Sequence, residues 1–368
     1  MNTVDNHGFS SEQLKSNFRN HLMFKNLKVV ELASVLAGPL TGTFFAELGA
    51  KVIKIENKLT NGDVTRTWKL PTESKEKSIS AYYSAANFLK ESLLLNVTDV
   101  LDYEILINHI KDADIVITNY KPNTARKLKL GYDDLKQHNQ SIIYAELTGF
   151  GGDESRPAFD VVLQAETGFM FMNGEPKRKP VKMPVALIDV LAAHHLKEAI
   201  LYAIINKLKT GKGKHIKVSL YESALASLAN QATNWLMEEH IPQPMGTQHP
   251  NIAPYGDMYS TSDGKLLVLA IGSDKQFENL CSLLSIELDA FVTNAQRLSK
   301  REALNSKLSE CIVQKTSKYW VSNLELKNIP YGIVKNMQEV FQDKKAKKML
   351  LNEIIEGIET VRVKTALV

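Results

Sequence analysis

The residues from 27 to 56 constrain the fold of this chain most, because they contain a complete strand–helix–strand pattern. LKVVELA is a buried strand, Pro39 suits a first helical position, and the helix that it opens ends at Gly49. KVIKIE then follows as a second strand. Two strands joined in this way form a right-handed parallel βαβ unit, and the small-residue turn 34–38 falls at the carboxyl edge of the sheet.

The same alternation continues along the chain, so the sequence predicts an α/β fold with an open, doubly wound (Rossmann-like) large domain. Further strands and helices are expected at 91–97, 100–113, 114–120, 132–139, 141–150, 215–220 and 221–239, the last of these as a single helix rich in Ala and Leu. The turn 34–38 lacks G-x-G-x-x-G, which disfavours a nicotinamide dehydrogenase. A nucleotide-like ligand at the start of the helix after this turn remains open.

We expect a second, smaller α/β domain, because loops replace the alternating strands and helices after the large domain, 24–240. A loop-rich linker is predicted for 241–264, and one strand and three helices for the small domain at 265–330. Residues 331–368 are expected to return and complete the large domain. Residues 1–23 are polar and lack the apolar centre of a signal peptide, so we interpret them as an N-terminal extension.

The composition excludes several classes of partner. The 368 residues carry a formal net charge of only +4 with no basic tract, so nucleic acid is not an expected partner. Cys281 and Cys311 are the only cysteines and form no CxxC pair, which indicates neither a disulfide framework nor a metal site. No apolar run reaches the length of a membrane span. We therefore expect a cytoplasmic protein that does not engage a membrane.

The stretch from 158 to 208 holds two acidic residues that each precede a helical pattern. Asp160 opens the first pattern and Asp189 the second, which Gly211 ends; prolines interrupt the segment between them. In one interpretation Asp189 is an N-cap, whose carboxylate accepts hydrogen bonds from the first turn. In the other, the helix start keeps this carboxylate ionised, and it attacks an activated acyl group.

Several blocks of the chain, in order, carry a resemblance to a known family. The first is LKVVELASVLAGPLTGTFFAELGAKVIKIE; after it come GDVTR, LTGFGG, RPAFDVVLQAETG, LIDVLAA, KTGKGKHIKVSLYESAL and HPNIAPYGDMYSTSDG. From Leu27 to Gln338 the chain resembles family III (CaiB/BaiF-type) CoA-transferases. The resemblance implies an enzyme that moves CoA from an acyl-CoA thioester to a free carboxylic acid, with no permanently bound cofactor.

The resemblance also implies an assembly and roles for particular residues. The two domains would be joined by long linkers, and two chains would interlock as a homodimer. Asp189 stands where the family has its nucleophile, so an acyl-aspartyl anhydride and an aspartyl-CoA thioester would form there. The family's CoA contacts fall on Val35, Leu36, Ala37, Asn57, Lys58, Leu95, Asn96, Asn119, Tyr120, Lys121, Lys127, Pro157, Phe159 and Asp160.

Two other functions remain open at this point. The α-methylacyl-CoA racemases resemble this chain in fold, but they need a histidine base just before the Asp160 position, where this chain has Phe159. A non-catalytic acyl-CoA-binding protein would keep Asp189 for capping alone. Two departures from the family pattern concern the ligand: Asn57 replaces a common arginine, and the glycine-rich loop of some members has no counterpart. Lys90 is a further candidate for the CoA phosphates.

Overall fold

The computed structural model describes residues 23–152, 154, 156–287 and 289–368. The chain forms two compact units. The first unit contains 23–169, Lys182–Glu239 and Lys348–Val368, and the second contains Met170–Val181 and His240–Lys347. The expected N-terminal extension, 1–23, lies outside the described residues except for Met23.

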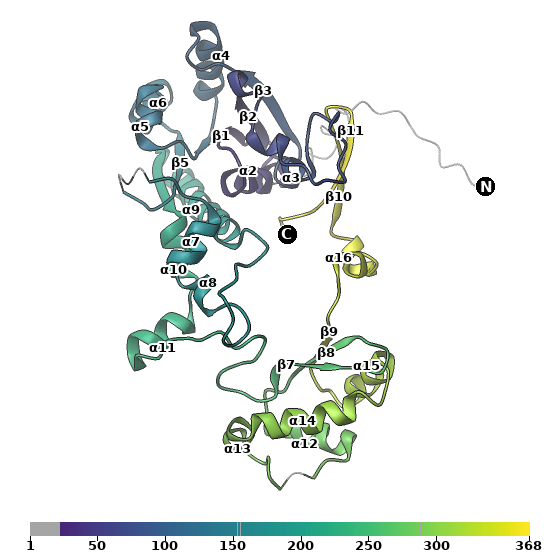
Figure 1. Cartoon of the computed structure of the whole chain (residues 1–368). Helices are drawn as coiled ribbons and strands as arrows, with labels where there is room; N and C mark the ends of the chain where they lie inside the picture. Colours follow the sequence, from purple (N-terminus) through teal and green to yellow (C-terminus); the bar gives the residue numbers. More distant parts are fainter. Residues whose placement is uncertain (1–22, 153, 155, 288) are drawn as a thin grey trace, which may run out of the picture. The chain divides into compact units, whose positions relative to one another are not determined.

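A six-stranded parallel sheet organises the first unit and confirms the predicted α/β class (Figure 1). Its strands are β1 (Lys28–Leu32), β2 (Lys51–Asn57), β3 (Lys90–Leu95), β4 (Ile115–Thr118), β5 (Ile143–Thr148) and β6 (Lys214–Ser219). Every neighbouring pair is parallel, in the order β3-β2-β1-β4-β5-β6. This is the order of the Rossmann fold, in which the direction of winding reverses between β1 and β4.

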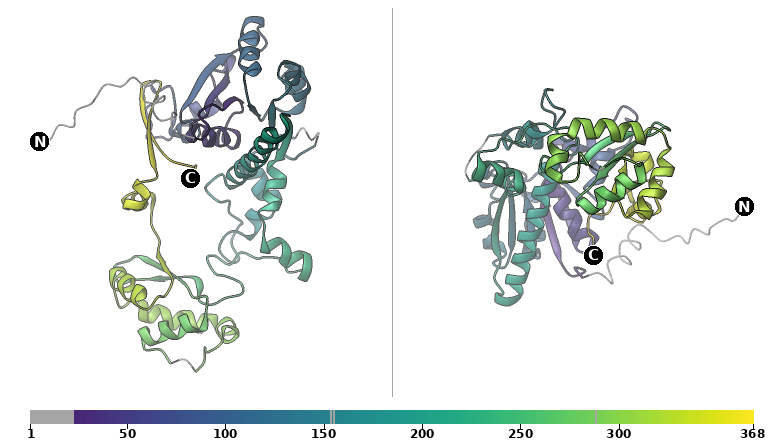
Figure 2. Two further views of the ribbon diagram at one scale, coloured as in Figure 1. Left: turned by 180° about the vertical axis from the view of Figure 1, so that it is seen from behind. Right: turned by 90° about the horizontal axis from the view of Figure 1, so that it is seen from below.

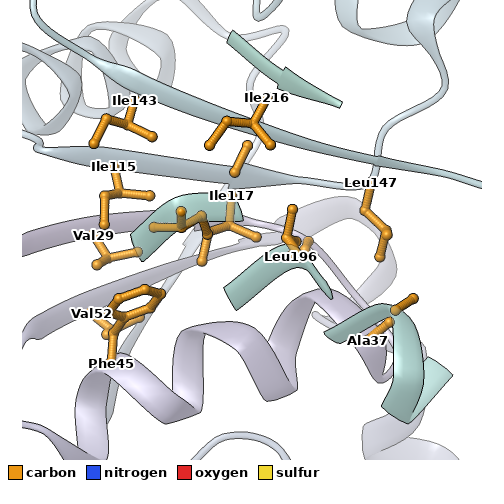
Figure 3. Packing of buried hydrophobic residues seen from close by; sticks show 14 of the residues in the cluster. Val29, Ala37, Phe45, Val52, Ile115, Ile117, Ile143, Leu147, Leu196 and Ile216 are labelled. Atoms are coloured by element: carbon orange, nitrogen blue, oxygen red, sulfur yellow. The ribbon is translucent and has the colours of Figure 1, made fainter. Parts of the chain in front are cut away.

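Helices cover both faces of this sheet, because its central strands are apolar on both sides. On one face, Val29 and Ile117 are buried in the same core as Phe45 (Figure 3). On the other face, Val30 and Val116 belong to a second core. The covering helices are α2 (Ala37–Glu47) and α9 (Leu187–Thr210) on the first face, and α4 (Val100–Lys111) and α6 (Tyr132–His138) on the second.

Two helical predictions differ from the structure. The second helix of the 158–208 stretch, α9, begins at Leu187 rather than at Asp189, and it ends at Gly211 as predicted. The single helix expected from Tyr221 to Glu239 is two helices, α10 (Leu220–Ala226) and α11 (Asn230–Glu238). The break has a backbone cause, because Ala229 has a φ of 48°, which no right-handed helix contains.

The second unit is a small α/β domain with three antiparallel strands. They are β7 (Tyr255–Ser260), β8 (Leu266–Ala270) and β9 (Tyr331–Ile333), in that order. The sequence predicted β8 alone, because β7 carries several exposed residues and β9 is only three residues long. The expected linker 241–264 therefore contains β7 and belongs to this unit, and the chain leaves the unit after Lys347 rather than near residue 331.

The helices of the second unit pack on this sheet around Phe277, Leu308 and Trp320. The three predicted helices are present, together with a short fourth one. They are α12 (Asp274–Leu284), α13 (Asn294–Ser299), α14 (Arg301–Ile312) and α15 (Ser317–Leu326). None of the helices in the described ranges combines the length and the apolar character needed to span a membrane.

The last residues return to the first unit as a hairpin of β10 (Leu350–Ile355) and β11 (Ile358–Val363). Strand β11 lies beside α3 (Ala81–Ala85), and the yellow hairpin is visible there from both sides (Figures 1 and 2). Arg362 and the Ala366 N–H both bind the carboxylate of Glu47 at the end of α2. The remaining short elements are η1 (Lys58–Thr60), η2 (Val64–Thr67), α5 (Pro122–Lys127), α7 (Asp160–Glu166), α8 (Phe169–Met172), α16 (Met337–Val340) and α17 (Lys344–Lys347).

Candidate active site

A pocket of about 140 Å³ opens at the carboxyl edge of the sheet in the first unit. Segments that follow neighbouring strands form its walls: 34–37 after β1, 119–122 after β4, and 147–149 at the end of β5. Strands β1 and β4 meet where the winding of the sheet reverses, which is where open α/β sheets bind ligands. Asp189, from α9, belongs to the same wall.

The turn after β1 is held by polar groups from elsewhere in the unit. The Asn119 side chain accepts the Ser34 N–H at 3.1 Å and donates to the Ser34 carbonyl at 2.9 Å. The Val35 N–H donates to the Asp63 carboxylate at 3.2 Å. The next two N–H groups, of Leu36 and Ala37 at the start of α2, have no hydrogen-bond partner within the described part of the chain. They are the donors that remain for an anionic ligand.

Asp189 is buried in the wall of the pocket, as the third residue of α9. The N-cap interpretation is wrong, because the cap residue is Ala186, which makes no side-chain capping bond. The expectation that the helix start keeps Asp189 ionised is also wrong. Burial, and after it the negative charge of Asp160, raise the pKa of Asp189 to about 7. Near neutral pH the carboxyl is therefore divided between its protonated and ionised forms.

Asp160 supplies the capping oxygen for α9 instead. Its Oδ1 accepts the Ile188 N–H at 2.7 Å, and its Oδ2 accepts from Gln164 Nε2 at 2.7 Å. Gln164 in turn accepts the Met183 N–H at 2.8 Å, so α7 fixes the segment that leads into α9. Asp160 was expected to contact CoA. It is buried and does not line the pocket, and its negative charge raises the pKa of Asp189.

Comparisons with known proteins agree with this fold. The model of CoA-transferase family III matches residues 24–366. The chain belongs to this family. A CaiB/BaiF family protein from Brucella suis superposes on it with a TM-score of 0.82 and 36% sequence identity, over 93% of this chain and 91% of that one.

Named relatives of this family III CoA-transferase extend over most of its length. The succinate–glutarate CoA-transferase of Agrobacterium fabrum is 34% identical over 86% of this chain and 81% of its own length. The succinyl-CoA:glutarate CoA-transferase of Homo sapiens is 33% identical over 89% of this chain and 75% of its own length. The chain is therefore an enzyme of the CoA-transferase class.

The pocket of this CoA-transferase brings together many of the residues that the family resemblance singles out. Asn57 lies in a neighbouring hollow of about 380 Å³, which shares Ser34 and Tyr120 with the pocket. Lys127 lines a separate groove of about 790 Å³ along α4. The expected residues that line the pocket itself are Val35, Leu36, Ala37, Asn119, Tyr120, Lys121, Phe159 and Asp189.

The remaining expected contacts lie away from the pocket. Lys58 and the Asn96 N–H are both directed to Asp102, at 3.9 Å and 2.8 Å. Leu95 is buried in the core on the α4 face of the sheet. Pro157 is exposed and does not line the pocket, although its neighbours Arg156 and Ala158 do. These four residues remain expected CoA contacts outside the pocket.

Lys90 was a candidate for the CoA phosphates, and the structure overturns this expectation. Its ammonium group is buried and donates to Glu31 at 2.7 Å and to the Pro39 and Ala86 carbonyls at 2.8 Å and 2.7 Å. Burial lowers the pKa of Lys90 to about 7, against the opposing effect of Glu31. A side chain enclosed by these acceptors stabilises the interior of the unit and does not reach a ligand.

Arg156 and Glu154 line the pocket but were not among the expected site residues. The Arg156 guanidinium stacks on the Phe150 ring at 3.7 Å, and it pairs with Glu166 at 2.7 Å and with Glu154 at 3.0 Å. The RPAFD block that resembles the family contains Arg156, so the signal was in the sequence. Arg156 therefore places a guanidinium, which is paired with two carboxylates, at the wall of the pocket.

Tyr82 was also missed, and no sequence pattern pointed to it. Burial, followed by the charges of Asp189, Asp160 and Asp63, raises the pKa of Tyr82 to about 12. Its ring packs edge-on against Trp68 at 5.1 Å between centroids. The phenol therefore keeps its proton near neutral pH, and it can donate a hydrogen bond there.

Proposed function

We propose that this enzyme transfers CoA from an acyl-CoA thioester to a free carboxylic acid, with Asp189 as the nucleophile. The observation that carries this proposal is the place of Asp189, a buried carboxyl in the same pocket as the free N–H groups of Leu36 and Ala37. A carboxyl with a pKa of about 7 is ionised in a substantial fraction of molecules at neutral pH. The ionised form is poorly hydrated in this wall, which favours its attack on a carbonyl carbon.

The reaction is a series of acyl exchanges. An Asp189 oxygen attacks the thioester carbonyl, the carbon–sulfur bond breaks, and an acyl-aspartyl anhydride and a CoA thiolate result. The thiolate attacks the aspartyl carbonyl, which releases the donor acid and leaves an aspartyl-CoA thioester. The acceptor carboxylate attacks this thioester, the carbon–sulfur bond breaks, and a second anhydride and the free CoA thiolate result. The thiolate then takes the acceptor acyl group as the new acyl-CoA and restores Asp189. No oxidant or energy source is needed, because each step exchanges one acyl bond for another.

Every attack in this series places negative charge on a carbonyl oxygen, and CoA brings phosphates that are also anionic. The Leu36 and Ala37 N–H groups stand at the start of a helix of 11 residues, where both hydrogen bonding and the helix dipole favour an anion. Lys121 lines the same pocket and adds a cation at the end of β4. These groups support the binding of an oxyanion next to Asp189.

The named relatives support a class of acid for this chain. Both names describe a CoA-transferase for succinate and glutarate, which are short dicarboxylic acids. We extend that class to this enzyme. The second carboxylate of such an acid needs a cation, and Arg156 lines the pocket in a suitable form, since a planar guanidinium can exchange one carboxylate partner for another.

We further propose that two chains interlock as a homodimer. The order of the units along the chain supports this, because the long excursion His240–Lys347 leaves the first unit and returns to it. The returning hairpin is fastened to the first unit by Arg362 and Glu47. The excursion and the first unit together form a closed loop of chain. Two chains can interlock only if each forms such a loop.

The nucleophile is tested by Asp189→Asn, which keeps the shape of the side chain and removes its charge. We expect CoA transfer from succinyl-CoA to glutarate to fall by about 1,000-fold or more. The pKa of Asp189 rises from 3.8 to about 7 on folding, so stability from its protonated form is present at low pH and is lost as pH rises through this window. At about pH 8 the variant is therefore expected to unfold at a higher temperature than the wild type, and the difference shrinks toward about pH 4.

The matched control is Glu198→Gln, which makes the same change of charge at an exposed position of α9 and is expected to leave transfer unchanged. Wild-type enzyme incubated with succinyl-CoA and quenched with hydroxylamine should carry a hydroxamate on Asp189, detectable by peptide mass spectrometry. A variant that keeps the wild-type rate, or a label confined to another residue, would show that Asp189 is not the nucleophile.

A further inference from the structure

Val35, in the turn that lines the pocket, has a backbone conformation that its side chain disfavours. Its φ is 73°, in the left-handed region, where a β-branched residue clashes with its own backbone. Glycine adopts this conformation freely, whereas valine does so only when its surroundings hold it there. The turn is therefore under a constraint from another part of the unit.

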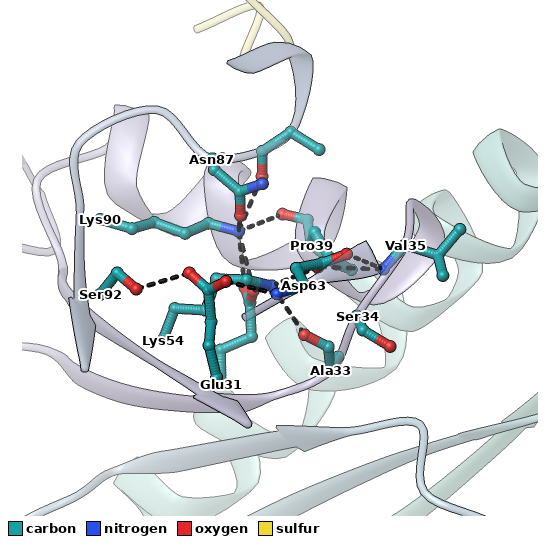
Figure 4. Close-up of polar contacts among 12 residues, drawn as sticks. Glu31, Ala33, Ser34, Val35, Pro39, Lys54, Asp63, Asn87, Lys90 and Ser92 are labelled. Atoms are coloured by element: carbon teal, nitrogen blue, oxygen red, sulfur yellow. Dashed lines mark hydrogen bonds and ion pairs between the residues drawn. The ribbon is translucent and has the colours of Figure 1, made fainter. Parts of the chain in front are cut away.

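The constraint comes from Asp63 (Figure 4). Its Oδ2 accepts the Val35 N–H at 3.2 Å and lies 3.0 Å from Lys54 Nζ. Its Oδ1 accepts the Thr65 N–H at 3.0 Å and the Thr65 hydroxyl at 2.8 Å. The carboxylate is buried, so water does not compete for these contacts. Asp63 thus has a fixed orientation, and through it the Val35 N–H does too.

Lys54 ties Asp63 to the end of β1. It is fully buried, and its ammonium group donates to Glu31 at 3.0 Å and to the Ala33 carbonyl at 2.8 Å. Burial opposes the charge on this amine, but Glu31 and Asp63 outweigh that effect and raise the pKa of Lys54. Lys54 therefore stays charged, and it joins the residues on either side of Ser34 into one network (Figure 4).

We propose that Asp63 is a positioning residue for the ligand. By holding Val35 at positive φ, it aims the Leu36 and Ala37 N–H groups into the pocket, where an oxyanion of acyl-CoA binds. Without this contact Val35 would relax to a negative φ, and the peptide groups after it would rotate. Asp63 lines the neighbouring hollow with Asn57 and not the pocket itself, so it acts on the Leu36 and Ala37 N–H groups through the backbone. The inference rests on the proposed function for the identity of the ligand.

The test compares CoA binding by calorimetry in the wild type, in Asp63→Asn, in Val35→Gly and in the double variant. Asp63→Asn keeps the size of the side chain and removes the charge that pairs with Lys54. We expect it to weaken CoA binding by about 10-fold when residue 35 is valine. When residue 35 is glycine, positive φ needs no support, and we expect the same change to weaken binding by about 3-fold or less. A purely structural role for Asp63 would give equal losses in the two backgrounds.

The matched control is Asp263→Asn in the second unit. The Asp263 carboxylate also accepts a hydroxyl and a backbone N–H, from Thr261 at 2.6 Å and Ser317 at 2.8 Å. We expect this change to leave CoA affinity at the wild-type value, because Asp263 supports no turn of the pocket.

Equal losses in the two backgrounds, or an unchanged affinity in folded Asp63→Asn, would overturn the proposal. If Asp63→Asn does not fold, Thr65→Val replaces it, because it removes one donor from Asp63 and keeps the charge. Its expected loss is about 3-fold, relieved by Val35→Gly, and the absence of any loss would equally overturn the proposal. Failure here leaves the Asp189 assignment standing, since binding and not turnover is measured. A wild-type protein that does not bind CoA would instead contradict the proposed function.

Discussion

Asp160 and Asp189 form a pair in which one carboxyl alters the chemistry of the other. Asp160 accepts hydrogen bonds from Ile188 and Gln164 and so has a fixed place behind the first turn of α9. Its negative charge adds to the effect of burial and raises the pKa of Asp189 to about 7. A more basic carboxylate oxygen is also a stronger nucleophile, so Asp160 favours the attack while limiting the pH range in which it occurs.

Asp160→Asn separates these effects, because Asn keeps an oxygen for the Ile188 N–H and loses the charge. We expect the rising limb of kcat/KM against pH, near about pH 7 in the wild type, to move to lower pH by about 0.5–1 unit. The phenol of Tyr82, with a pKa of about 12, stays protonated throughout the profile and does not contribute. Asp160→Ala, which also removes the capping oxygen, is expected to lower stability by about 0.5–2 kcal/mol. A limb that stays in place or moves to higher pH in Asp160→Asn would contradict this account.

The sequence predicted the residues of the site unevenly, for a physical reason. Asp189 and the turn after β1 lie where apolar segments give way to helices, so local pattern finds them. The roles of Asp63 and Asp160 depend on contacts to Val35 and Ile188 that each span 28 positions. No local pattern encodes such a contact. Tertiary placement alone makes one aspartate a support for a turn and another a cap for a helix.

At the scale of elements, the predicted helices and strands that the structure contains are mainly those with a regular pattern of buried residues. The parallel strands were predictable because their residues are apolar on both faces and their connecting helices are amphipathic. The boundaries that moved have specific causes: a cap for α9 supplied from α7, and a positive φ at Ala229 that divides one expected helix into α10 and α11. In the second unit, β7 and β9 were missed because partly exposed, short strands carry little periodic signal.

Gly42, within α2, provides a prediction at this scale. A Cβ there would lie 1.9 Å from Glu31 Oε2 and 3.4 Å from Lys90 Nζ, so the helix can cover the buried ion pairs only with glycine at this position. Alanine is normally the better helix residue by about 1 kcal/mol. Here we expect Gly42→Ala to lower the free energy of unfolding by about 1–3 kcal/mol, measured by urea denaturation.

Gly332→Ala is the control for this change, because a Cβ at Gly332 meets no atom within 4 Å in the described structure. We expect it to alter the free energy of unfolding by less than about 0.5 kcal/mol. Equal stability of Gly42→Ala and the wild type would mean that Glu31 moves aside at little cost and that the buried network is not rigid.

At the scale of the whole molecule, an interlocked dimer makes a kinetic prediction. Two chains linked in this way separate only when one of them opens, so dissociation requires partial unfolding. We expect mixed populations of differently tagged enzyme to form no mixed dimers at nanomolar concentration over days. After unfolding and joint refolding they should form mixed dimers, which native mass spectrometry detects. Rapid exchange in native buffer, or the mass of a monomer, would rule out interlocking.

The carboxylate of Glu47 receives its partners late in the synthesis of the chain. Glu47 stands at the end of α2, whose first turn lines the pocket, and its partners Arg362 and Ala366 follow 315 and 319 positions later. On the ribosome, this end of α2 therefore lacks its hydrogen-bond donors for most of the synthesis, and the charge of Lys197 on α9 opposes that of the acid. The nascent first unit stays incomplete until the second unit has left the exit tunnel. That interval is the time at which a chaperone, or a second nascent chain, has access to it.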